Sequence, residues 1–112
     1  MSKLKDEYTC SLQLAVDLIG GKWKLMILFY LIDDTKRFGE LQNDIPDITQ
    51  KMLTQHLREL EDSNLIKRKV YPVVPPKVEY SLTEHGISLI PLIKSMCDWS
   101  ISYANDNNIN LK

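Results

Sequence analysis

The sequence predicts a mainly helical α+β domain organised around residues 47–77, where an amphipathic helix is followed directly by a basic β-hairpin. In the helix, Leu53, Leu57 and Leu60 recur at the spacing that brings them to one face. The opposite face carries amides, hydroxyls and cations. The hairpin holds four cationic side chains and no acidic residue between Leu65 and Lys77. A polar helix face beside a cationic hairpin is what contact with double-stranded DNA requires.

The length and composition indicate one globular domain. The chain has 112 residues, of which 44% are hydrophobic and 26% charged, with a net charge of −1. It lacks an apolar run of the roughly 18 residues that a membrane span needs and a secretory signal at its N-terminus. Cys10 and Cys97 are too few and too far apart for a disulfide framework. We therefore expect a cytoplasmic protein without a membrane partner.

The N-terminal half is predicted to be helical. Thr9 or Ser11 is expected to cap a helix that runs to about Ile19. This helix is apolar around most of its circumference, so it is either a core helix or a helix shared with a second subunit. After the break at Gly20–Gly21, a second helix is expected over residues 22–32. Its apolar stripe should form the centre of the core, and consists of Trp23, Met26, Ile27, Tyr30 and Leu31.

Two helices joined by a tight turn are predicted next. After a short strand at residues 36–38, the first helix is expected over residues 39–44 and must end before Pro46. Thr49 is a suitable N-cap for the second, the amphipathic helix over residues 49–62. Asn64, which tolerates the left-handed conformation, should end it. This arrangement is a helix-turn-helix.

The C-terminal half should contain the hairpin and one more helix. Strands are expected over residues 65–71 and 77–82, separated by a proline-rich tip. Thr83 should cap a last helix that reaches about residue 105, with a kink or break at Pro91. That helix has more apolar surface than one small core could cover. The order of elements is that of a winged helix-turn-helix with additional N- and C-terminal helices.

The side chains opposite the leucine stripe are the candidate DNA-reading residues. Gln pairs with adenine, and Arg or Lys with guanine, in a major groove. Residues near the helix start also donate to phosphates, and wing cations contact phosphates or a minor groove. The recognition-helix candidates are Thr49, Gln50, Lys51, Thr54, Gln55 and Arg58, and the wing candidates, within residues 67–80, are Arg68, Lys69 and Lys77. The alternatives are an ordinary solvated helix face, or a winged helix that binds protein and not DNA.

Several ordered motifs together resemble the HxlR-type family of bacterial winged helix-turn-helix transcriptional regulators, which are MarR-like. The motifs are Gly20-Gly21-Lys22-Trp23, Arg37-Phe38-Gly39-Glu40-Leu41, Ile45-Pro46-Asp47-Ile48-Thr49-Gln50-Lys51-Met52-Leu53-Thr54, Leu57-Arg58-Glu59-Leu60, Tyr71-Pro72-Val73-Val74-Pro75-Pro76-Lys77-Val78-Glu79-Tyr80, Leu82-Thr83-Glu84-His85-Gly86 and Trp99. They span residues 9–103, so the domain is predicted to cover residues 9–105 with flexible tails at 1–8 and 106–112. The chain differs from the family pattern in having Ser11 in place of proline and Asn64 in place of glycine.

The resemblance implies a homodimer built from the first and last helices that binds an inverted-repeat operator. Its half-sites would lie about 34 Å apart, one helical turn of DNA. The surplus apolar surface of those two helices agrees with this implication. The expected interface residues are Leu12, Val16, Ile93, Met96, Trp99 and Tyr103.

Cys10 is a candidate redox thiol because some members of this family are thiol sensors that use the cysteine of the N-terminal helix. Its place near a helix start favours a thiolate. An unreactive cysteine is the alternative, and the effector, oxidant or small molecule, is left open. Cys97 lies on an apolar helix face and is expected to be buried.

Neither an enzyme nor a metal site is expected. His56 and His85 fall on different helices without clustered ligands, and the sequence has no glycine-rich phosphate loop or nucleophile elbow. No cofactor is therefore expected.

Overall fold

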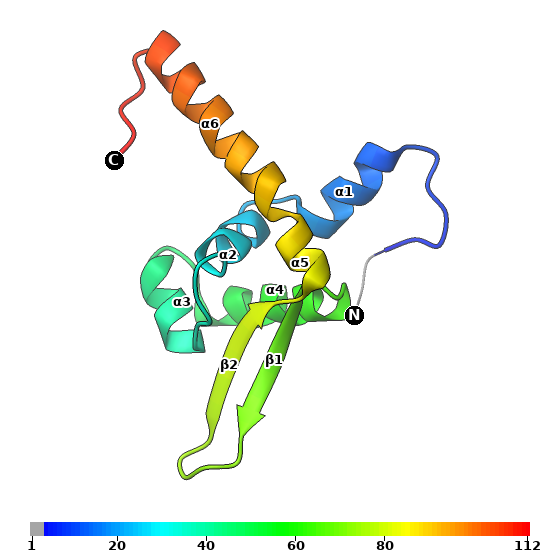
Figure 1. The fold of residues 1–112 in the computed structure, drawn as a ribbon, viewed down its shortest axis with the longest axis vertical. Coiled ribbons are helices and arrows are strands. Elements are labelled where there is room, and N and C mark those ends of the chain that lie inside the picture. The colour runs from blue at the N-terminus through cyan, green and yellow to red at the C-terminus, as the bar shows by residue number, and fades with distance from the viewer. Residues whose placement is uncertain (1–3) are drawn as a thin grey trace.

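The computed structural model describes residues 4–112 and forms a helical body from which a two-stranded wing projects (Figure 1). The elements run in the order α1 (Ser11–Ile19), α2 (Lys24–Tyr30), α3 (Phe38–Asp44), α4 (Gln50–Asp62), β1 (Ile66–Tyr71), β2 (Lys77–Leu82), α5 (Glu84–Ser88) and α6 (Ile90–Asp106). This is the predicted winged helix-turn-helix with an extra helix at each end. Figure 1 shows α1 and α6 extending away from the body on the side opposite the wing.

The core lies where α2, α3 and α4 meet. Ile27, Leu28, Leu41, Leu53 and Leu60 have no exposed surface. Trp23 is also buried, as its place in the apolar stripe predicts. Met26 was expected in the same core, but 38% of its surface is exposed, because this face of α2 borders an open groove beside α6.

Local signals fix both ends of α4. The Thr49 hydroxyl accepts a hydrogen bond from the Met52 amide at 3.1 Å, which is the predicted N-cap. At the other end, Asn64 has a φ of 61°, the left-handed conformation expected there. The recognition helix thus begins and ends as the sequence predicts.

The start of α1 and both ends of α2 differ from expectation. Cys10, and not Thr9 or Ser11, is the N-cap of α1, and its side chain makes no capping bond. The second helix was expected over residues 22–32 and is shorter, because Gly21 has a φ of 88° and the chain is still turning at Trp23. At its other end, the Leu31 and Ile32 amides bond three residues back, which closes the helix in a tight final turn.

The predicted strand at residues 36–38 is reduced to one bridge between Lys36 and Tyr80. Its two hydrogen bonds, Lys36 N to Tyr80 O at 3.0 Å and Tyr80 N to Lys36 O at 2.7 Å, tie the approach to α3 against the wing. The strand cannot lengthen, because Arg37 is already the N-cap of α3 and its amide donates to Glu40 at 2.8 Å.

The last helix breaks near Pro91, as predicted. The break separates α5 from α6 at Leu89, and Pro91 stands in the first turn of α6, where it needs no amide donor. Ile93 then enters the core and is only 4% exposed. Ile93 was expected at a dimer interface, but its own subunit covers nearly all of its side chain, so it offers little surface to a partner.

Candidate nucleic-acid interface

The helix α4 presents its polar face to solvent because its apolar face is fixed to the core. Leu53, Leu57 and Leu60 are buried, and most of the predicted DNA-reading side chains are exposed. Thr54 is half-buried, and its hydroxyl donates to the Gln50 carbonyl at 2.9 Å. The exposed members are Thr49, Gln50, Lys51, Gln55 and Arg58.

A buried ion pair fixes α4 to α2. Lys24 Nζ lies 2.9 Å from Glu59 Oε1, and each side chain is only 11% exposed. Glu59 Oε2 also accepts from Gln55 Nε2 at 3.3 Å, so one carboxylate contacts both the core helix and a predicted DNA-reading side chain. Neither Lys24 nor Glu59 was among the residues predicted from the sequence. The signal was available in Glu59, a charged residue two positions after Leu57 and one before Leu60 in the helix.

The wing is an antiparallel ribbon whose register places its cations on both faces. Arg68 lies opposite Tyr80, and Lys69 lies opposite Glu79. The ammonium groups of Lys69 and Lys77 each lie 4.9 Å from the centre of the Tyr71 ring, a cation–π distance. Tyr71 therefore holds two of the predicted wing contacts side by side.

Two acidic side chains lie beside the cations of the wing, Glu79 from β2 and Glu61 from α4. Lys77 Nζ lies 3.4 Å from Glu79, and Arg68 Nε lies 3.8 Å from Glu61 of α4. The pKa of the Glu79 carboxyl is lowered, chiefly by a hydrogen bond from Tyr71 and further by the neighbouring Lys77. Burial acts in the opposite direction but is outweighed. Both carboxylates reduce the cationic charge predicted for this surface.

The helix and the wing meet in one cleft. It has a volume of about 230 Å³, and its walls include Thr54, Arg58, Glu61 and Arg68. The structure thus brings the predicted recognition-helix and wing residues together at the base of the wing, which Figure 1 shows extending beyond α4. Lys69 and Lys77, further along the wing, do not line this cleft.

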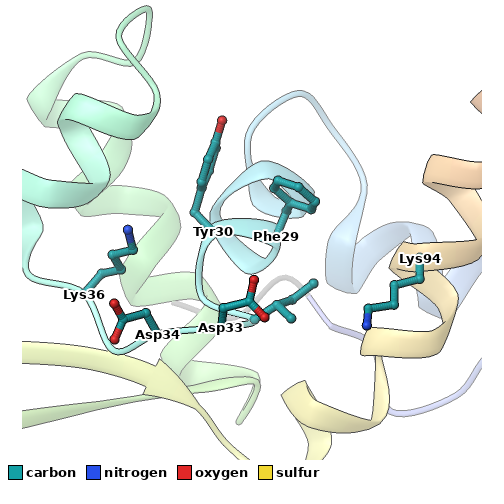
Figure 2. Close-up of a pocket in the computed structure, with 7 residues that line it drawn as sticks. Phe29, Tyr30, Asp33, Asp34, Lys36 and Lys94 are labelled. Atoms are coloured by element: carbon teal, nitrogen blue, oxygen red, sulfur yellow. The ribbon is translucent and has the colours of Figure 1, made fainter. Parts of the chain in front are cut away.

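A second hollow, of about 450 Å³, lies between the end of α2 and α6. Figure 2 shows Lys94 reaching from α6 toward Asp33, with Phe29 and Tyr30 nearby. The charges of the two lysines and the two aspartates that line the hollow cancel. One of these lysines, Lys36, also forms an ion pair with Asp44 at 3.1 Å. The hollow therefore indicates no particular ligand charge.

Apolar side chains of α1 and α6 remain exposed in the single chain. Among the predicted dimer residues, Leu12 is 68% and Trp99 is 66% exposed. Val16, Met96 and Tyr103 are exposed as well. Of the two interpretations of the first helix, this exposure disfavours a helix buried in its own subunit.

The two cysteines are both exposed. Cys10 stands at the start of α1, where the sequence placed it. Cys97 was expected to be buried, and this is wrong for the single chain, because its face of α6 borders the open apolar groove beside α2.

Within residues 4–112, no group of three or more His, Cys, Asp or Glu side chains is arranged to hold a metal ion. None of the helices in this part of the chain has the length and apolar character needed to cross a membrane.

The comparisons with known proteins agree with this architecture. An uncharacterized HTH-type transcriptional regulator of Methanothermobacter thermautotrophicus is 55% identical over 100 residues, which cover 89% of this chain and 76% of that protein. Two solved structures are also similar. The redox regulator HypR in its oxidized form is 49% identical, with a TM-score of 0.80 over 83% of this chain and 96% of that one. In its reduced form it is 44% identical, with a TM-score of 0.85 over 90% of this chain and 100% of that one.

The family described as HxlR-like helix-turn-helix matches residues 18–108, which include every element from α2 to α6. The chain therefore belongs to the HxlR-like helix-turn-helix family of transcriptional regulators.

Proposed function

We propose that the chain is a DNA-binding transcriptional regulator that acts as a homodimer on an inverted-repeat operator in the cytoplasm. One observation carries the proposal: Thr54 and Arg58 of α4 share a cleft with Arg68 of the wing. A polar helix face and a cationic ribbon thus form one continuous surface, which matches the alternation of base edges and phosphates along DNA. Membership of a family of transcriptional regulators supports the same function.

The proposed roles follow from side-chain chemistry and exposure. Gln50, Lys51, Gln55 and Arg58 are exposed on α4 and have the groups that pair with adenine or guanine. Thr49 already caps the helix, so its contribution would be at the helix start, where backbone amides face a phosphate. Lys69 and Lys77 would contact phosphates or a minor groove from the wing.

The dimer would bring together α1 and α6 of two copies. Their apolar residues are exposed here, and burying them would supply the driving force for association. Trp99→Asp should yield a monomer in analytical ultracentrifugation while helix content, measured by circular dichroism, stays unchanged. Val73→Asp is the matched control, since Val73 is 52% exposed at the wing tip. A dimeric Trp99→Asp protein would remove α6 from the proposed interface.

Thiol control through Cys10 is a second proposal, favoured by its exposure at the first turn of α1. Hydrogen peroxide would oxidise the Cys10 thiol to a sulfenic acid with release of one water, and a second thiol would condense with the sulfenic acid to a disulfide with release of another water. The similarity to the structure of the redox regulator HypR supports this proposal. Cys10→Ser should abolish any oxidant-induced change in DNA binding, and Cys97→Ser should leave it. An unchanged response in Cys10→Ser would exclude Cys10.

The decisive experiment selects bound duplexes from random and genomic DNA at low salt, with and without oxidant. We expect enrichment of an inverted repeat, and binding that weakens steeply as salt is added. Gln50→Ala and Arg58→Ala should relax the selected sequence without reducing thermal stability. A protein that shows no preference for any duplex at low salt would support the alternative, a protein-interaction module.

A further inference from the structure

The cleft between α4 and the wing contains a carboxylate at a place where two arginines converge. Arg58 and Arg68 line it from opposite elements, and Glu61 lies between the helix and the wing with its Oε2 3.8 Å from Arg68 Nε. Glu61 is one turn after Arg58 on α4, so both reach the same side of the helix. Arg68 is therefore paired with a carboxylate of the protein itself, and Arg58 lines the same cleft.

Tyr80 also lines the cleft, and the charges of Arg58, Glu61 and Arg68 all affect its pKa. Its pKa is raised, first by burial and also by the Glu61 carboxylate, while the charges of Arg68 and Arg58 act in the opposite direction. Thr54, one turn before Arg58, completes the polar lining. The cleft is therefore a hollow lined by two guanidinium groups, a tyrosine side chain and a single carboxylate.

We propose that this cleft is a phosphate-binding subsite for one DNA backbone phosphate, and that Glu61 occupies the phosphate's place in the free protein. The inference rests on the proposed function, because it identifies a DNA phosphate as the ligand. Guanidinium groups bind carboxylates and phosphates with the same fork of donors, so one anion can replace the other. The phosphate replaces the Glu61 carboxylate at Arg68, and that carboxylate turns toward solvent. Arg58, on the opposite wall, adds its positive charge to the attraction and keeps its donors for a base edge.

Glu61 would then weaken binding to every DNA sequence. A phosphodiester carries one negative charge, and a carboxylate beside it weakens its attraction to the arginines. The penalty does not depend on the bases, so it falls on specific and non-specific DNA alike, and only duplexes with good base contacts overcome it. The number of competing non-specific sites in a genome makes such a penalty useful.

The experiment measures the affinity for a random-sequence duplex by fluorescence anisotropy as the salt concentration is varied. Glu61→Gln should tighten binding by about two- to fivefold at low salt, the range expected when an exposed charge interaction is removed. The slope of log affinity against log salt should steepen by up to about 0.9, since one arginine becomes fully available. Asp62→Asn is the matched control, because it removes the same charge from the next residue of α4 and should change affinity less.

A second variant separates this site from the general charge of the wing. Arg68→Gln should weaken binding more than Lys67→Gln, which removes one charge from the neighbouring wing position. The difference in affinity between the Arg68→Gln and Lys67→Gln variants should be larger when Glu61→Gln is also present, because Arg68 is then no longer paired with a carboxylate. Circular dichroism confirms that each variant is folded.

The outcomes distinguish the two proposals. If the unchanged protein fails to bind any duplex, the proposed function is wrong. If it binds, but Glu61→Gln weakens binding or leaves it equal to Asp62→Asn, the inference is overturned. In that case Glu61 only positions Arg68.

Discussion

The ion pair between Lys24 and Glu59 should be the most sensitive polar contact in the protein. Its two charged atoms are 2.9 Å apart, and each side chain is 11% exposed. Glu59→Gln keeps the shape of the side chain but leaves the Lys24 ammonium group without its opposite charge. Removing one partner of a buried pair costs about 3–5 kcal/mol. The cost should lie near 3 kcal/mol here, because the long stem of Lys24 lets the ammonium group move toward water.

That loss is large compared with the total stability of about 5–15 kcal/mol that domains of this size have. The assay is urea unfolding at one fixed protein concentration, since a dimer would make the apparent stability depend on concentration. The control is Glu61→Gln, whose pair with Arg68 is 38–48% exposed and should contribute less than about 1 kcal/mol. Each variant removes one carboxylate from α4.

The double variant Lys24→Met/Glu59→Gln, measured with the two single variants, completes a double-mutant cycle of unfolding free energies. Replacing both charges removes the unpaired ammonium group, so the double variant should be more stable than Glu59→Gln alone, with a coupling of about 2 kcal/mol. A cost below about 1 kcal/mol for Glu59→Gln, or strictly additive effects, would refute the reasoning. It would mean that water reaches this pair.

Two further predictions concern the wing and its junction with α5. Gly86→Ala should lower the free energy of unfolding by about 1–3 kcal/mol, because a Cβ there would collide with the Leu65 backbone oxygen. Gly39→Ala has open space and lies in α3, so it should instead be neutral or stabilising by up to about 1 kcal/mol. The side-chain carboxyl of Glu79, followed by NMR, should titrate below its ordinary pKa, and Tyr71→Phe should raise that pKa. Since the folded-state pKa is lowered, the contribution of Glu79 to stability is present above its unfolded pKa and is lost as the pH falls through its folded pKa. An unshifted Glu79, or no response to Tyr71→Phe, would contradict the proposed hydrogen bond.

Local chemistry explains why most element boundaries could be predicted from the sequence. Thr49, Asn64 and Pro91 act through their own backbone geometry and through neighbours within one helical turn, so their effects are visible in the sequence. The boundaries that were wrong lie where short-range bonds tighten the ends of α2, which periodicity does not reveal.

Contacts between distant residues explain the rest. Glu59 appears in the sequence as an ordinary charged residue of α4, and only the packing of α2 against α4 shows it paired with Lys24. Glu61 meets Arg68 because the wing folds back beside the helix. The burial of Ile93 depends on the angle at which α6 leaves α5. Periodicity ranks apolar residues by helix face, but it does not determine which face another element covers.

The buried and exposed ion pairs indicate that α4 is held more firmly in place than the wing. The recognition helix is held by buried leucines and by a buried charge pair to α2, and both resist displacement. Since α6 inserts Ile93 into the same core and α2 packs against both α4 and α6, α4 is connected through α2 to the helix proposed to form the dimer. The outer wing is connected through exposed contacts such as Arg68–Glu61, which are weak and exchange readily with water or phosphate. The spacing of two recognition helices should therefore be set by the dimer, while each wing adjusts to the DNA that it meets.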